Sequence, residues 1–247
     1  MRERRRILAL VRKTERENIG FLERSSEEEL ASWMLDGLNL RPVGYRDDRS
    51  PATHFCEEFE KLSKSTQEKL KQVLIQAISS WDTAAHKAEV LSDLAFVSGY
   101  LRIEGTLPHL IRIVDEKLVS PEDEKSHQSQ SVVVSVVSGF ATNELAKEAL
   151  KKWYADENFD WKYKAIICLG LMEAEPYNSP VFLSQFLRVV DEHPNYFRLD
   201  YTAVETAMRI GPDELENILE GFDSKSAKEM IQAIPVAREI IEESKKG

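Results

Sequence analysis

The sequence predicts an all-α protein in which helical hairpins follow one another as an α-solenoid. Three observations predict this fold. Ten glycines and nine prolines in 247 residues fall below the average share of about 12%, which disfavours turn-rich β folds. Helix-capping sequences recur along the chain. Predicted helix starts also recur at separations of 36, 36 and 32 residues, which is typical of helical repeats.

The composition is that of a globular protein. The chain is 42% apolar and 31% charged, which excludes wholesale disorder. No apolar run approaches the ~18 residues that a membrane span needs, so we expect no transmembrane segment. The basic start is not followed by the apolar stretch of a secretory signal. Cys56 and Cys168 lie far apart and suit a reducing compartment, so we expect a cytoplasmic protein.

The N-terminus has a charge opposite to that of the rest of the chain. Residues 1–24 contain eight basic and four acidic side chains, and the whole chain has a formal charge of −10, so residues 25–247 hold −14. This pattern predicts either a solvated helix face or a basic arm for nucleic acid or a membrane. The interspersed glutamates favour the solvated face. The residues of the possible arm are Arg2, Arg4, Arg5, Arg6, Arg12 and Lys13.

The first helices are marked by caps and breakers. Ser25 with Glu28, and Ser26 with Glu29, offer overlapping capping boxes before a helix whose apolar residues recur at helical spacing from Leu30 to Leu38. Residues 39–51 contain two prolines and a glycine and are expected to form a loop. We therefore expect a helical N-terminal region with a loop over 1–50 and a repeat domain over 51–247.

The sequence also predicts helices in the middle of the chain. Ser65 and Glu68 form another predicted capping box, and a long helix is expected over 84–101. The β-branched run Val132–Val137 favours a strand by propensity alone. It has no partner strand, so a buried helix is the better prediction.

The repeat consists of two-helix units. Each predicted first helix has an apolar or aromatic residue six and ten positions after its start. The four starts are Pro108, Glu144, Pro180 and Pro212, with N-caps expected at Thr106, Asn143, Ser179 and Gly211. The second helices are expected over Ser131–Phe140, Trp161–Glu173 and Leu199–Ile210.

Two segments resemble HEAT repeats. Residues 107–115 (LPHLIRIVD) resemble the first helix of a HEAT unit, and residues 164–171 (KAIICLGL) resemble its second helix, in which a Leu-Gly pair allows close helix approach. The likeness covers about residues 106–235. It implies a right-handed α-solenoid of HEAT-like hairpins with a helical N-terminal cap region, and it supports the fold more than any function.

The common local signatures of catalysis and metal binding do not occur in the sequence. His54 and Cys56 lack a second ligand pair, and a single pair such as His86 and Glu89 is more typical of a surface contact. The sequence therefore predicts no catalytic, cofactor-binding or metal-binding residues.

Aromatic residues gather at two corresponding turns of the repeat. Such residues are enriched in recognition hot spots, although packing between neighbouring repeats is the commoner role. The candidate partner-binding residues are Trp153, Tyr154, Phe159, Trp161, Tyr163, Tyr196, Phe197 and Tyr201.

These features predict a non-enzymatic interaction module, an adaptor or scaffold that presents a solenoid groove to a basic protein or peptide. The alternative is a nucleic-acid-binding protein, since some DNA glycosylases resemble HEAT solenoids and use Trp, Asp and Arg. The residues that could take those roles are Trp153, Asp156, Trp161 and Arg188. The acidic body disfavours nucleic acid except at the N-terminal arm.

Overall fold

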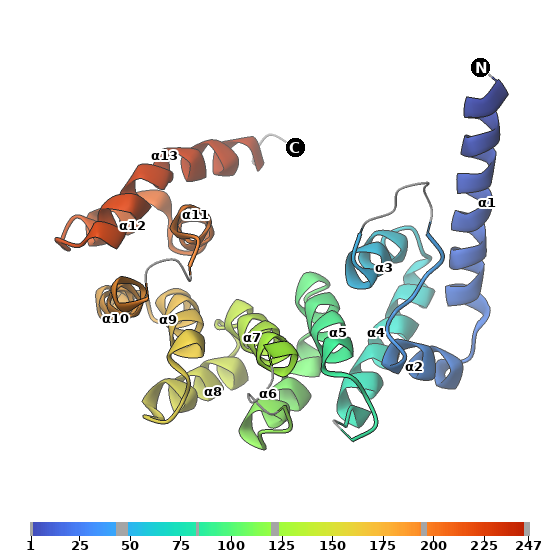
Figure 1. Cartoon of the computed structure of the whole chain (residues 1–247), viewed down its shortest axis with the longest axis horizontal. Helices are drawn as coiled ribbons and strands as arrows, with labels where there is room; N and C mark the ends of the chain where they lie inside the picture. The colour runs from blue at the N-terminus through green and yellow to red at the C-terminus, as the bar shows by residue number, and fades with distance from the viewer. Residues whose placement is uncertain (1, 43–48, 83, 120–123, 194–196, 245–247) are drawn as a thin grey trace. The chain divides into compact units, whose positions relative to one another are not determined.

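A computed structural model of the chain describes residues 2–42, 49–82, 84–119, 124–193 and 197–244, and the regular structure of these residues is helical (Figure 1). The all-α prediction is confirmed. The helices are α1 (Arg2–Arg24), α2 (Glu27–Leu35), α3 (Pro51–Phe59), α4 (Lys64–Ser80), α5 (Ala88–Tyr100), η1 (Glu104–Thr106), α6 (Leu107–Asp115), α7 (Glu124–Gly139), α8 (Glu144–Ala155), α9 (Trp161–Ala174), η2 (Pro176–Asn178), α10 (Ser179–Glu192), α11 (Leu199–Ile210), α12 (Pro212–Leu219) and α13 (Lys225–Ser244).

The chain divides into two compact units, Met1–Val137 and Ser138–Gly247. The boundary lies within α7. The position near residue 50 that the sequence suggested as a boundary falls inside the first unit, where α1 contacts α3 and α2 packs against α4 and α5. The N-terminal helices therefore contribute to the packing of the first unit.

Capping determines where the helices of the first unit begin. The Ser26 hydroxyl accepts from the Glu29 amide at 3.2 Å and the Glu29 carboxylate accepts from the Ser26 amide at 2.8 Å, so the predicted capping box is present. The predicted box at Ser65 is wrong, because the N-cap of α4 is Ser63. Likewise α5 begins at Ala88 rather than Ala84, because Asp82 accepts from the Ala84 amide in a turn.

The four predicted helix starts are confirmed to within one residue. α8 and α12 begin at the predicted residues, and α6 and α10 begin one residue before the predicted prolines. Asn143 caps α8 by accepting from the Leu145 amide at 3.0 Å. The hydroxyls of Thr106 and Ser179 do not cap their helices. Each donates instead to the carbonyl of a residue that precedes its helix, Ile103 and Met172 respectively.

Glycine and valine allow close packing around the end of α7. The run Val132–Val137 is helical as predicted, and Val133, Val134 and Val137 are fully buried. In the second unit Gly170 of α9 faces Ser138, and a Cβ on Gly170 would lie 3.0 Å from the Ser138 carbonyl oxygen. The Leu-Gly pair therefore marks a close helix approach, as the sequence predicted.

The helices of the second unit form two layers. In one layer α11 contacts both α9 and α13, and in the other α10 contacts α12. α10 also packs against α9 and α13, burying Leu183, Phe186 and Val190. The end of α10, the start of α11 and the first half of α13 consequently meet around one cleft.

Candidate functional site

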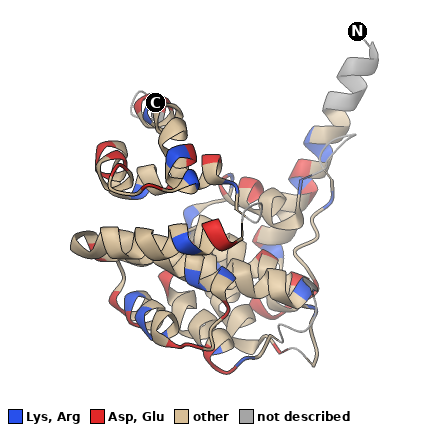
Figure 2. Cartoon of the chain, turned by 60° about the vertical axis from the view of Figure 1, so that its left-hand side comes forward, with Lys and Arg blue, Asp and Glu red and all other residues tan. Residues whose placement is uncertain are grey.

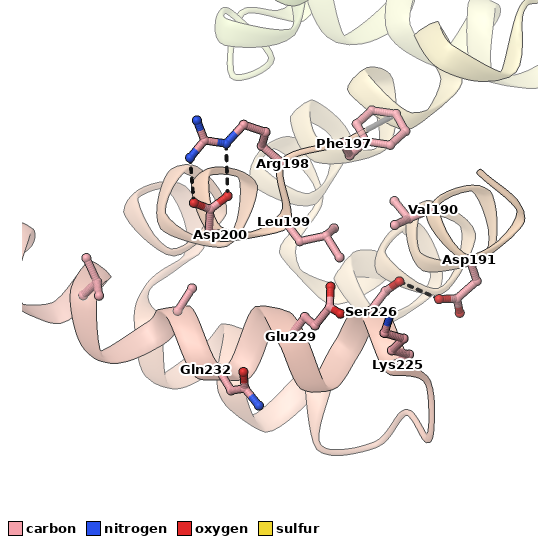
Figure 3. A pocket seen from close by; sticks show the side chains of 12 residues that line it. Val190, Asp191, Phe197, Arg198, Leu199, Asp200, Lys225, Ser226, Glu229 and Gln232 are labelled. Atoms are coloured by element: carbon pink, nitrogen blue, oxygen red, sulfur yellow. Dashed lines mark hydrogen bonds and ion pairs between the residues drawn. The ribbon is translucent and has the colours of Figure 1, made fainter. Parts of the chain in front are cut away.

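The cleft lies entirely within the second unit and has a volume of about 780 Å³. Figure 3 shows its walls, formed by the end of α10, the residues that lead into α11 and the exposed face of α13. We call it the α10–α13 cleft. It is lined by Val190, Asp191, Phe197, Arg198, Leu199, Asp200, Lys225, Ser226, Glu229, Gln232, Ala233 and Val236.

Helix periodicity explains why these side chains meet. α10 turns Leu187 and Val190 into the core and leaves Asp191 exposed beside them. On α13 the residues at 229, 232, 233 and 236 occupy positions i, i+3, i+4 and i+7, so they follow one face of the helix. Val236 on this face is 51% exposed. The cleft therefore has an apolar floor that is open to solvent.

The charged groups of the cleft are paired with one another. The Arg198 guanidinium donates to Asp200 at 2.8 and 3.4 Å, and this hydrogen bonding lowers the pKa of the Asp200 carboxyl (Figure 3). The Ser226 hydroxyl donates to Asp191 at 2.5 Å. Lys225 lies 3.5 Å from Glu229. Exposed pairs of this kind are worth only about 0–1 kcal/mol, so a ligand can exchange them for its own contacts.

An apolar floor with a polar rim is the usual anatomy of a protein interface. Val190, Phe197 and Val236 can receive an apolar side chain, and the rim supplies three acidic and two basic groups. The volume is also within the range of about 300–1,000 Å³ found for ligand pockets. The arrangement is suited to holding a short peptide segment by one or two apolar side chains.

Three of the predicted aromatic residues pack inside the α8–α9 hairpin. Trp153 is 3% exposed and stacks on Phe159 with ring centroids 5.8 Å apart. Tyr163 is 2% exposed and meets the edge of Phe159 at the same distance. These contacts hold the turn between the two helices. Trp153 and Tyr163 have too little exposed surface to contact a partner.

The other predicted aromatic residues connect this hairpin to the cleft. Tyr154 meets Phe182 of α10, and Trp161 stacks on His193 with centroids 3.7 Å apart. Phe197 contacts Trp161 and also lines the cleft. Tyr201, in the first turn of α11, is 65% exposed. Tyr196 lies outside the described residues.

Sequence reasoning missed the α13 wall of the cleft. Acidic and basic residues dominate the end of the sequence, so its apolar positions are not conspicuous. Val236 and Ile240, 51% and 40% exposed, are separated by one helical turn and are the signal that could have indicated a binding face.

The residues of the possible basic arm all lie on α1. Arg12 and Lys13 are exposed, and Lys13 is 3.9 Å from Glu17. The side chains of Arg2, Arg4, Arg5 and Arg6 lie outside the described part of the structure.

The residues considered for a glycosylase have other contacts in the structure. Asp156 follows α8 and accepts from the Asn158 amide at 2.9 Å, which stabilises a turn. Arg188 is exposed on α10, beside a smaller hollow that Phe222 and Asp223 also line. Trp153 and Trp161 make the ring contacts described above.

The thiols of Cys56 on α3 and Cys168 on α9 are both buried. Burial raises the pKa of Cys56 to about 12, and the nearby Glu60 carboxylate adds to this effect. Burial likewise raises the pKa of Cys168 to about 12. Both thiols are reduced and stay protonated at neutral pH, so they are poor nucleophiles.

The chain matches no family model, no curated protein and no solved structure. In the part of the chain that the structure describes, none of the helices combines the length and the apolar character that crossing a bilayer requires.

Proposed function

We propose that the protein is a non-enzymatic interaction module, an adaptor in the cytoplasm that binds a short segment of a partner protein in the α10–α13 cleft. The proposed architecture is a right-handed α-solenoid of HEAT-like hairpins, since such folds expose the faces of successive helices to partners. The observation that supports this function best is the open apolar floor of the cleft within a rim of exchangeable ion pairs.

The chemistry of the cleft indicates the chemistry of the segment. Phe197, Leu199 and Val236 favour an apolar anchor on the partner. The rim has one more acidic group than basic groups, and residues 25–247 hold a formal charge of −14. Both features favour lysine or arginine next to the anchor. The reduced state of Cys56 and Cys168 is compatible with a cytoplasmic adaptor.

Selection of random peptides displayed on phage against the purified chain tests this function. We expect enriched peptides to share an apolar residue next to lysine or arginine. Val236→Asp should weaken the selected peptide at least tenfold, because it places a charge on the floor of the cleft. Since Val236 is 51% exposed, the fold should tolerate the change.

Val181→Asp is the matched control. Val181 is 57% exposed on α10 and does not line the cleft, so this variant should bind the selected peptide like the wild type. If no peptide is enriched, or if both variants bind it equally well, the α10–α13 cleft is not the binding site.

A further inference from the structure

One face of α5 in the first unit combines exposed aromatic rings with carboxylates. Glu89, Asp93, Phe96 and Tyr100 occupy positions i, i+4, i+7 and i+11, which share one side of a helix. Glu60, at the end of α3, joins this side by accepting from the Tyr100 hydroxyl at 3.2 Å. We call these five residues the α5 acidic face.

The two rings of this face are open to solvent. Phe96 is 42% exposed and Tyr100 is 55% exposed. Their rings stack with centroids 6.2 Å apart and planes inclined by 25°. Exposed ring faces attract a lysine or arginine side chain, most strongly where carboxylates lie nearby. Neighbouring exposed rings of this kind are typical of an interaction surface rather than of a core.

The carboxylates of this face differ in their partners. Glu89 forms an ion pair with Lys125 of α7 at 2.5 Å. Asp93 is half-buried, and among the described residues it has neither an ion pair nor a hydrogen bond. Burial, together with the charge of Glu89, raises the pKa of Asp93 to about 6. A cation next to Asp93 would offset the free-energy cost of burying this unpaired carboxylate.

The same chain contains a helix of opposite character. The first half of α1, residues 2–13, contains five arginines and Lys13, against one glutamate. Leu10 in this half is 59% exposed. An unpacked helix of this length is only marginally stable in water, so a partner surface would stabilise it. Figure 2 marks the basic residues along the described part of α1.

The contacts that hold α1 lie in its second half. Asn18 exchanges hydrogen bonds of 2.9 and 3.1 Å with the backbone of Arg41, and Lys61 donates to Glu15 at 2.5 Å. Leu22 is fully buried. Figure 1 shows the N-terminal half of α1 extending beyond the other helices of the first unit, away from α5. The basic half is therefore presented outward.

We propose that the α5 acidic face binds the basic N-terminal half of α1 from a second copy of the chain. Guanidinium groups lie over Phe96 and Tyr100 and pair with Asp93. The inference does not use the α10–α13 cleft. It is tested on the chain alone, so its failure and that of the proposed function are distinguishable.

Sedimentation velocity of the full chain over a range of concentrations tests the proposal. We expect a concentration-dependent dimer at about 50 mM NaCl that weakens at least tenfold at about 500 mM, where exposed charges are screened. Asp93→Asn should weaken the dimer about tenfold, and so should the triple variant Arg4→Gln, Arg5→Gln and Arg6→Gln, because each removes one side of the charge pairing. The control Glu116→Gln makes the same charge change as Asp93→Asn at an exposed site just after α6, so its dimer should match that of the wild type.

Mixing the two variants provides the decisive measurement. The intact α1 of the Asp93→Asn chain can still bind the intact face of the arginine variant, so the mixture should form heterodimers that neither chain forms alone. Circular dichroism on each variant reports whether it is folded. A monomer at all concentrations, a dimer that all three variants retain, or binding of the wild type only to vesicles of anionic lipid would overturn the proposal.

Discussion

Asp93 shows how a single residue can be unfavourable for folding and favourable for binding. Its carboxylate is half-buried on α5, and among the described residues it has no cation next to it. The sequence shows only an aspartate one turn after Glu89 on a helix. Its burial, and the pairing of Glu89 with Lys125 of α7, come from tertiary packing.

The pKa of Asp93 makes stability depend on pH in a defined direction. The folded-state pKa, about 6, lies above the ordinary value of 3.8, so the folded state binds the proton more tightly. Proton binding to Asp93 stabilises the folded state fully below about pH 4, and this stabilisation is lost as the pH rises through about 6. Asp93→Asn should therefore raise the free energy of unfolding at about pH 8 by about 1 kcal/mol, discounted for partial exposure.

Urea unfolding at a series of pH values measures this effect. The difference between Asp93→Asn and the wild type should shrink toward zero as the pH falls below 3.8, the ordinary pKa, because Asp93 then becomes protonated in both states. Glu116→Gln is the control for the loss of one exposed carboxylate. A constant difference across the series would mean that Asp93 does not titrate as its surroundings indicate.

At the scale of elements, N-cap residues determine where a helix begins. Residues 25–29 contain two overlapping capping boxes, and the structure uses only Ser26. Ser26→Ala should lower the free energy of unfolding by about 1 kcal/mol, because the Glu29 amide loses its acceptor. Ser25→Ala is the matched control and should change it by much less. Thermal unfolding by circular dichroism compares them, and equal losses would contradict this assignment.

The elements that the sequence predicted best are those with a proline or a cap at a fixed position. α12 begins at Pro212 as predicted, and α8 begins at Glu144 behind its Asn143 cap. The N-cap of α4 is Ser63, two residues before the predicted cap Ser65, because residues 63–66 contain several hydroxyls that can cap. Local sequence allowed both registers, and packing selected one of them.

At the scale of the whole molecule, each unit has its own core. In repeat-like structures a change in one unit propagates mainly to its neighbours. Gly170→Ala places a Cβ 2.3 Å from the Ser138 hydroxyl and 3.0 Å from its carbonyl oxygen. We expect it to destabilise the second unit by about 1–3 kcal/mol through overpacking.

Hydrogen exchange followed by mass spectrometry locates this effect. Exchange in Gly170→Ala should accelerate within 138–244, while that within 9–137 stays close to wild type. Gly139→Ala is the control, since a Cβ there meets no atom within 4 Å. Faster exchange in both units would show that they unfold as one.

The sequence by itself determined that the chain is helical, where most of the helices begin, and that Gly170 allows a close approach, because caps, prolines and apolar periodicity act over a few residues. Only the tertiary structure decided which aromatic side chains are exposed. It buried Trp153 and Tyr163, left Tyr201 and Phe96 open to solvent, and joined α10 and α13 around a cleft. Exposure depends on which neighbouring helix covers a side chain, and that neighbour lies tens of residues away in the sequence.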